Sequence, residues 1–103
     1  MKELLPDIDQ WRAVGLPVVL ATVVRAAGST PRRVGARMVI AGDGRFSGSV
    51  SGGCVEGAVI EEAYEIFAGG ASRLVHYGIS DEMGWEVGLA CGGSIDVFIE
   101  PLR

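Results

Sequence analysis

Glycine residues are concentrated in three short stretches of this chain, and this clustering constrains the folds that it can adopt. The chain holds 16 glycines in 103 residues, more than twice the usual proportion. They gather at residues 42–57, 69–70 and 84–93. Because glycine gives the unfolded chain extra conformational entropy, such density is typical of backbone that turns tightly or closely approaches another group. The clusters therefore indicate turns within one domain and not a flexible linker.

The hydrophobic patterns between these turns predict short regular elements. Apolar residues recur at helical spacing over residues 3–14 and 55–67, with Ser51-Gly52-Gly53-Cys54 opening the second helix. Gly15 and Gly69-Gly70 are the expected helix stops. The β-branched or alternating segments predict strands at residues 18–24, 36–41, 45–50, 72–77 and 94–100.

The order of these elements predicts one α+β, or α/β, domain over residues 1–103. Its expected architecture is a mixed five-stranded sheet with about two helices. Gly42-Asp43-Gly44 is a hairpin turn signal, and Gly48 within a strand indicates a bulge or a close backbone contact. The segment between the third and fourth strands is long enough for a parallel crossover. A long loop is expected at 78–93, with one helical turn near 81–85.

Composition excludes several classes of protein. The net charge of −4 argues against a general nucleic-acid binder. No apolar run approaches the roughly 20 residues of a membrane span, and the first residues lack a signal-peptide pattern, so we expect a cytoplasmic protein. Cys54 and Cys91 are then free thiols. With His76, the only histidine, they do not complete a zinc site, and His76 is interpreted as an ordinary strand residue.

The first candidate site is the stretch from Gly48 to Gly57, which contains Ser51-Gly52-Gly53-Cys54 and Glu56. A glycine-rich turn that leads into a helix leaves backbone N–H groups available to an anion, and Ser49 and Ser51 add hydroxyl donors. A helix N-terminus favours a thiolate, so Cys54 could bind a soft metal or attack an electrophile. The alternative is a plain glycine turn around a packed cysteine.

Two further segments carry polar or reactive side chains. Cys91-Gly92-Gly93 precedes a strand, so both cysteine segments adjoin strand ends and could face one pocket. The basic segment that follows Gly28 combines hydroxyls and guanidinium groups, which suits a phosphate; its candidates are Ser29, Thr30, Arg32 and Arg37. The alternatives are a packed cysteine and a solvated basic loop.

Five blocks of the sequence occur in an order and with a spacing typical of one known family. They are Ala27-Gly28-Ser29-Thr30-Pro31-Arg32, Gly35-Ala36-Arg37-Met38, Asp43-Gly44-Arg45, Ser51-Gly52-Gly53-Cys54-Val55-Glu56, and Cys91-Gly92-Gly93 with residues 95–102. From about residue 17 to 102, the chain resembles the amino-terminal domain of the XdhC/CoxI family. Members of that family are xanthine dehydrogenase accessory proteins and carbon monoxide dehydrogenase maturation factors.

The resemblance implies a carrier or chaperone more than a catalyst. It implies that the chain binds the molybdenum cofactor (molybdopterin), supports its sulfuration and delivers it to the apo-enzyme of a molybdenum hydroxylase. The implied cofactor-binding residues are Ser29, Thr30, Arg32, Arg37, Ser51, Gly52, Gly53, Cys54, Glu56, Cys91, Gly92 and Gly93, with Cys54 as the metal ligand. A phosphate suits the backbone turn and the arginines, and molybdenum accepts thiolate ligation.

The chain departs from the family pattern in two places. Full-length members usually carry a carboxy-terminal Rossmann-like domain, whereas this chain stops at Arg103, so a partner that is a separate Rossmann-domain subunit is expected. A homodimer is also expected, because the core is thin and the strand Val18–Val24 is hydrophobic. Many members have two adjacent cysteines in the later block, where this chain has Ala90 and Cys91. Two other functions stay open: a docking or regulatory module that binds a hydroxylase or a Rossmann-domain partner without cofactor, and a sulfur-transfer enzyme with Cys54 as nucleophile.

Overall fold

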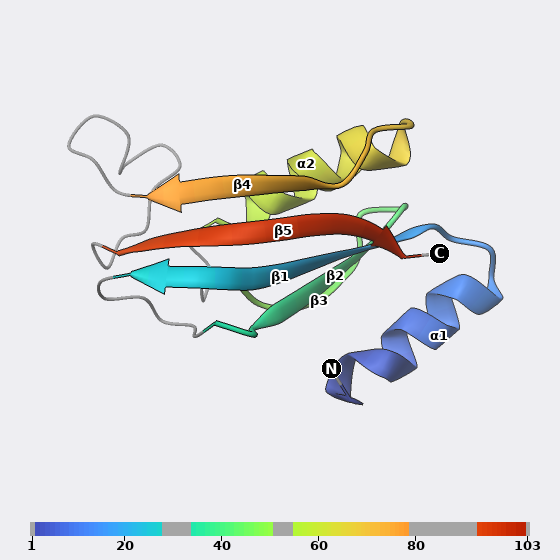
Figure 1. Ribbon diagram of the computed structural model, residues 1–103. Coiled ribbons are helices and arrows are strands. Elements are labelled where there is room, and N and C mark those ends of the chain that lie inside the picture. Colours follow the sequence, from blue (N-terminus) through green and yellow to red (C-terminus); the bar gives the residue numbers. More distant parts are fainter. Residues whose placement is uncertain (1, 28–33, 51–54, 79–92, 103) are drawn as a thin grey trace.

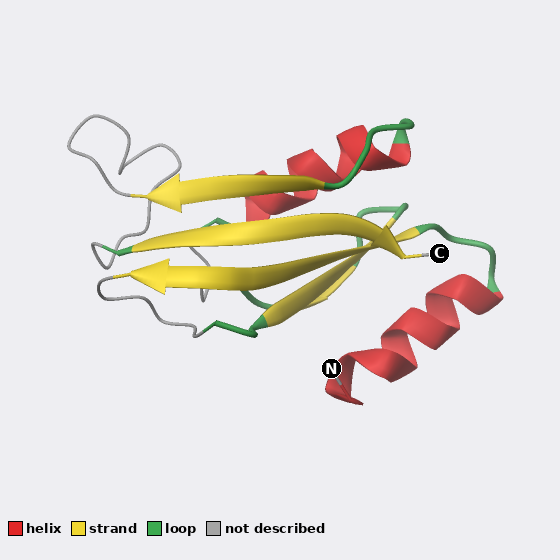
Figure 2. Cartoon of the chain, viewed as in Figure 1, coloured by secondary structure: helices red, strands yellow, loops and turns green. Residues whose placement is uncertain are grey.

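The protein is an α+β domain in which a five-stranded sheet carries one helix on each face (Figures 1 and 2). The computed structural model describes residues 2–27, 34–50, 55–78 and 93–102. Its elements are a short 3-10 turn (Lys2–Leu4), α1 (Leu5–Ala13), β1 (Val18–Ala27), β2 (Arg37–Ala41), β3 (Phe46–Gly48), α2 (Glu56–Phe67), β4 (Arg73–Gly78) and β5 (Ser94–Leu102). The predicted α+β class, five strands and two helices are confirmed.

The sheet has the strand order β3-β2-β1-β5-β4, and all four pairings between the described strands are antiparallel. The prediction of a mixed sheet is therefore wrong. The crossover through α2 does connect β3 to β4, but these strands lie at opposite edges of the sheet. The longest strands, β1 and β5, pair with each other at the centre, and β4 adds antiparallel to β5.

Each helix covers a different face of the sheet. Helix α2, behind β4 and β5 in Figure 1, packs against the larger core. That core contains Val19, Ala21, Val23, Met38, Ile40, Val50, Val55, Val59, Ala63, Ile66, Tyr77, Ile95, Val97 and Ile99. Helix α1 packs Leu4, Ile8 and Trp11 on the other face, over alternate residues of β1 and β2. Since α1 is short, it leaves much of β4 and β5 uncovered on its face (Figure 1).

The local features of the hairpin between β2 and β3 follow the sequence closely. The amide of Gly44 donates to the carbonyl of Ala41 at 2.9 Å, which closes the predicted turn. Gly48 has a φ of 84°, and a Cβ there would lie 2.4 Å from the carbonyl oxygen of Arg37. The predicted close backbone contact at Gly48 is therefore confirmed, and only glycine fits it.

The helix boundaries differ slightly from the predicted ones. Helix α1 ends at Ala13, and Gly15 then adopts a φ of 85°. Helix α2 begins at Glu56, later than predicted, with Val55 at its N-cap. The turn at 51–54 and the helical turn expected near 81–85 lie outside the described residues. Neither described helix is long and apolar enough to cross a membrane.

Candidate functional site at one end of the sheet

Three strands end at the same end of the sheet, here called the loop end. Ala27 at the end of β1 pairs with Ser94 at the start of β5, and Ser94 also pairs with Gly78 at the end of β4. On the other side of β1, the end of β3 pairs with the start of β2 through Gly48 and Met38. The arrowheads of β1 and β4 point to this end in Figure 1. The antiparallel topology therefore directs the described residues that flank all three candidate segments toward this end, although Met38 itself pairs with Ala21 in the middle of β1.

Three of the twelve predicted cofactor-binding residues lie in the described part of the chain. They are Arg37, Glu56 and Gly93. The other nine lie outside the described residues: Ser29, Thr30, Arg32, Ser51, Gly52, Gly53, Cys54, Cys91 and Gly92. Gly93 is buried and comes immediately before Ser94, at the loop end.

The carboxylate of Glu56 binds the chain that leaves β3. Its Oε2 accepts hydrogen bonds from the hydroxyl of Ser49 at 2.7 Å and from the backbone amide of Val50 at 3.0 Å. Glu56 is buried, with 9% of its surface exposed. Because Glu56 is the first residue of α2, these two hydrogen bonds connect the chain on either side of the segment 51–54. Its contacts give Glu56 a positioning role beside the candidate cysteine turn.

Arg37 lies on the wall of a hollow between the first turn of the chain and the β2–β3 hairpin. The hollow has a volume of about 440 Å³ and is lined by Glu3, Leu4, Ala36, Arg37, Gly48 and Ser49. This volume is within the range of about 300–1,000 Å³ that is usual for small-molecule sites. A hydrogen bond from its own backbone amide is the main cause of the lowered pKa of Glu3, and the charge of Arg37 contributes least. Arg37 and Glu3 therefore give the wall of the hollow one cationic and one anionic side chain.

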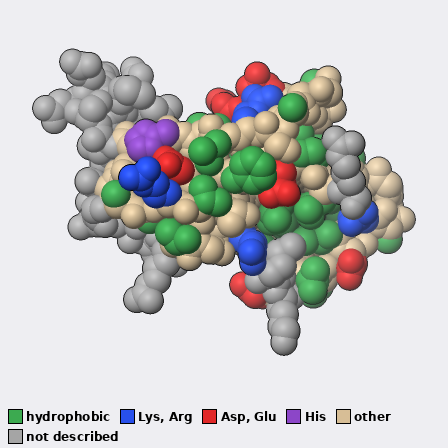
Figure 3. Space-filling model, in the orientation of Figure 1, with side chains coloured by type: hydrophobic (Ala, Val, Ile, Leu, Met, Phe, Trp, Pro, Cys, Tyr) green, Lys and Arg blue, Asp and Glu red, His purple; other side chains and the backbone are tan. Residues whose placement is uncertain are grey.

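Sequence reasoning missed a row of charged side chains on the face of the sheet opposite α2. Arg25, Asp96 and His76 lie directly across from one another on β1, β5 and β4. Nδ1 of His76 is 2.5 Å from Oδ1 of Asp96. Figure 3 shows the histidine (purple) beside acidic and basic side chains on this face. The strand pattern around His76 predicts an ordinary strand residue, and it gives no sign of Asp96, which lies 20 residues away in the sequence.

The described residues hold no ready-made metal centre. Within residues 2–27, 34–50, 55–78 and 93–102, no group of three His, Cys, Asp or Glu side chains could hold a metal ion. Both cysteines lie outside these ranges. What the described part of the loop end offers is hydrogen-bond donors, two arginines and two hollows, which suit a small polar ligand.

These features define a small α+β domain with two hollows in its described part. The chain belongs to the XdhC and CoxI family, to which residues 11–78 match. It is 42% identical over 89 residues to the molybdenum cofactor insertion chaperone PaoD of Escherichia coli (strain K12), a match that covers 86% of this chain and 28% of that protein. It is also 38% identical over 84 residues to a probable xanthine dehydrogenase subunit of Bacillus subtilis (strain 168), covering 80% of this chain and 26% of that protein.

A solved structure shares the same fold. The crystal structure of a xanthine dehydrogenase from Bacillus halodurans superposes with a TM-score of 0.78 at 32% sequence identity. The superposition covers 95% of this chain and 30% of that one. The chain thus spans less than a third of the length of these relatives. The resemblance to the XdhC/CoxI family is confirmed for a domain-sized part of such proteins.

Proposed function

We propose that this domain binds the molybdenum cofactor and takes part in its maturation and insertion into a molybdenum hydroxylase. The observation that carries the proposal is the 42% identity with a molybdenum cofactor insertion chaperone across 86% of the chain. The antiparallel topology supports it, because the flanks of every predicted cofactor-binding segment are directed toward the loop end. In this function the cofactor is cargo, and the domain is a carrier more than a catalyst.

Each part of the loop end has a proposed task. The thiolate of Cys54 would ligate molybdenum, a role suited to a soft sulfur ligand. Backbone amides of the turn at 51–53, together with Arg32 and Arg37, would bind the anionic groups of the pterin phosphate. The hydroxyls of Ser29 and Thr30 would add donors, and the segment Cys91-Gly92-Gly93 would complete the site. Glu56 would hold the cysteine turn in place through Ser49 and Val50.

The partners follow from the same proposal. The client would be the apo-enzyme of a xanthine dehydrogenase or carbon monoxide dehydrogenase type, reached in the cytoplasm. A separate subunit with a Rossmann-type domain is the second proposed partner, on the family resemblance alone. A homodimer stays a prediction, which sedimentation of the purified chain would test.

The proposal is tested by titrating the purified chain with isolated molybdenum cofactor under anaerobic conditions. Cys54→Ser is expected to weaken binding at least about tenfold, or roughly 1.4 kcal/mol, while thermal unfolding is unchanged. Arg37→Ala is expected to weaken it as well, since the charge lines the loop-end hollow. Arg45→Ala is the matched control, because Arg45 pairs with Asp43 in the turn at the opposite end of β2. Unchanged affinity in Cys54→Ser contradicts the proposed metal ligand.

One observation favours the second candidate function, a docking module that binds no cofactor. Leu74 of β4 is 60% exposed and pairs across the strands with Phe98 of β5, on the face that α2 does not cover. A surface of this kind suits contact with another protein. If a hydroxylase is captured by the purified chain, and the isolated cofactor fails to bind at any concentration, the docking function replaces the carrier function.

A further inference from the structure

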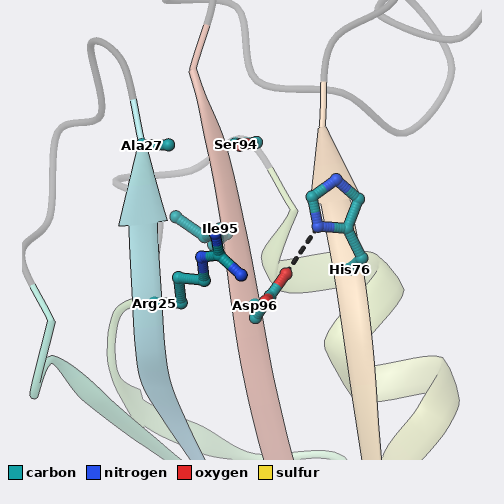
Figure 4. A pocket seen from close by; sticks show the side chains of 6 residues that line it. All are labelled: Arg25, Ala27, His76, Ser94, Ile95 and Asp96. Atoms are coloured by element: carbon teal, nitrogen blue, oxygen red, sulfur yellow. Dashed lines mark hydrogen bonds and ion pairs between the residues drawn. The ribbon is translucent and has the colours of Figure 1, made fainter.

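A bulge in β1 turns a charged side chain to the open face of the sheet. Val23 lies in the core beneath α2, and the β1–β5 register shifts between Val23 and Arg25. After this shift Ala26 packs against the α2 core, while Arg25 and Ala27 line a hollow on the opposite face. The bulge thus reverses the alternation of side chains, and it brings Arg25 into one row with Asp96 and His76 (Figure 4).

The hydrogen bond between His76 and Asp96 has a defined direction. The carboxylate of Asp96 is acceptor-only when ionised, so Nδ1–H of His76 donates to it across 2.5 Å. The Asp96 side chain is 19% exposed and that of His76 is 68% exposed. A carboxylate that binds one imidazole nitrogen fixes the ring and leaves the other nitrogen for a ligand. Nε2 of His76 is therefore the available nitrogen of this pair.

The next row toward the loop end consists of small residues and leaves a hollow. Ala27, Ser94 and Gly78 lie across from one another on β1, β5 and β4. A Cβ on Gly78 would lie 2.9 Å from Nε2 of His76 and 3.3 Å from Cβ of Ser94. Because Gly78 has no side chain, there is space for the imidazole of His76 beside it.

The hollow has the size of a small ion or a terminal group. Its volume is about 210 Å³, and its walls are Arg25, Ala27, His76, Ser94, Ile95 and Asp96. This is several times the roughly 30 Å³ that one water occupies in the liquid. It is below the range of about 300–1,000 Å³ typical of sites for whole drug-sized molecules. The hollow therefore has room for a phosphate group.

The charges in the row depend on the protonation of His76. The guanidinium of Arg25 is always protonated, and Asp96 offsets its charge. A neutral His76 leaves the row without net charge, and a protonated His76 gives it a charge of +1. Among the described residues, the other charged group of β5 on this face is Glu100, four positions further along. Arg73 of β4 instead pairs with Glu62 of α2 at 2.9 Å.

We propose that this hollow is an oxyanion site that binds a phosphate group with uptake of a proton by His76. The guanidinium of Arg25, Nε2–H of the protonated imidazole and the hydroxyl of Ser94 supply donors from three strands (Figure 4). Charge-assisted donors of this kind bind phosphate oxygens strongly. The inference goes beyond the proposed function, because it assigns binding to residues that the cofactor proposal does not use. The phosphate could be free or part of a phosphate monoester such as the pterin.

The test uses the single histidine of the full chain as a probe. Proton or nitrogen NMR follows the imidazole of His76 from about pH 5 to 8, with inorganic phosphate or with sodium chloride at equal ionic strength. If phosphate binds about tenfold more tightly to the protonated form, saturating phosphate moves the midpoint of the titration up by about one pH unit. No movement beyond that seen in chloride overturns the proposal.

Two variants make the test specific. Arg25 is exposed, so Arg25→Ala should fold normally and lose at least about tenfold in phosphate affinity. Arg45→Ala, with the same change of charge at the other end of the sheet, should keep the wild-type response. His76→Gln should bind phosphate weakly and should lose the part of the pH dependence that the imidazole contributes. Equal phosphate affinity in Arg25→Ala and the wild type, or the same pH dependence of binding in His76→Gln and the wild type, overturns the proposal.

A competition experiment separates the two sources of the phosphate group. If inorganic phosphate competes with isolated molybdenum cofactor, and Arg25→Ala weakens both, the site takes the phosphate of the cofactor. If cofactor affinity is the same in Arg25→Ala and phosphate still shifts His76 in the wild type, the site takes free phosphate. Cofactor binding that depends on Cys54 with no phosphate response at His76 overturns this inference alone and leaves the proposed function standing.

Discussion

Oε2 of Glu56 accepts hydrogen bonds from the hydroxyl of Ser49 and from the buried amide of Val50. The two sides of this contact are six or seven residues apart and enclose the cysteine turn at 51–54. Glu56 was predicted as a cofactor-binding residue on its place in a family block. Its observed partners explain why a carboxylate suits this position.

Removal of this carboxylate should destabilise the domain. Glu56→Ala leaves the buried amide of Val50 without this acceptor, and such a loss costs about 1–3 kcal/mol. Glu56→Gln retains one acceptor oxygen and should cost less. Urea unfolding monitored by circular dichroism measures both changes. The control is Glu61→Ala, at an exposed position of the same helix, which should change the free energy of unfolding by no more than about 0.5 kcal/mol. If Glu56→Ala has the same small effect, the hydrogen bonds of Glu56 do not contribute to stability.

Gly48 should not tolerate a side chain. Gly48→Ala places a Cβ 2.4 Å from the carbonyl oxygen of Arg37 at a φ of 84°. The left-handed conformation costs roughly 1–2 kcal/mol, and the backbone clash adds about 1–3 kcal/mol. The control is Gly57→Ala in α2, where a Cβ meets nothing within 4 Å. This substitution should stabilise the helix by about 0.5–1 kcal/mol. Thermal unfolding separates the two, and equal signs would contradict the steric argument.

Helix α1 should be held to the sheet mainly by Trp11. This side chain is 5% exposed and packs over Val18, Leu20 and Val39. Trp11→Ala is expected to lower the free energy of unfolding by about 3–5 kcal/mol. Val14, which is 68% exposed just after the helix, provides the control, since Val14→Ala should have little effect. A small loss in Trp11→Ala, measured by urea unfolding, would mean that α1 contributes little to the folded domain.

Tyr77 should make the domain sensitive to alkaline pH. Burial, with the nearby charges of Glu62 and Glu61, raises the pKa of the phenol. In the unfolded chain the phenol ionises near pH 10, so stability that is present below that pH is lost as the pH rises above it. Tyr77→Phe should reduce this alkaline loss, which unfolding at pH 8 and pH 10.5 measures. Tyr64→Phe, at a half-exposed position, should leave it unchanged.

Tyr77→Phe should also keep or raise stability near neutral pH. Its hydroxyl is buried and has no hydrogen-bond partner among the described residues. An unsatisfied buried hydroxyl costs free energy, so its removal should stabilise the domain by up to about 1 kcal/mol. A clear loss of stability in Tyr77→Phe would indicate that the hydroxyl has a partner in the folded protein.

The regular elements were predictable because each depends on a short stretch of chain. The β-branched run at 18–24 and the alternation at 94–100 predicted β1 and β5, and both strands extend a few residues further. The turn at 42–44 and the close contact at Gly48 were also predicted. For the candidate site, ordered blocks of sequence led to the correct family, since family blocks are read from residue identity and spacing alone.

The sequence by itself determined which segments form strands and helices, where the tight turns lie and which family the chain belongs to. Only the tertiary structure decided that β5 inserts between β1 and β4, that every described pairing is antiparallel, and that a bulge turns Arg25 toward Asp96 and His76. The physical reason is the distance along the sequence between the residues that interact. Turn and strand preferences depend on a few neighbouring residues, whereas strand order and side-chain rows depend on contacts between segments far apart in the sequence.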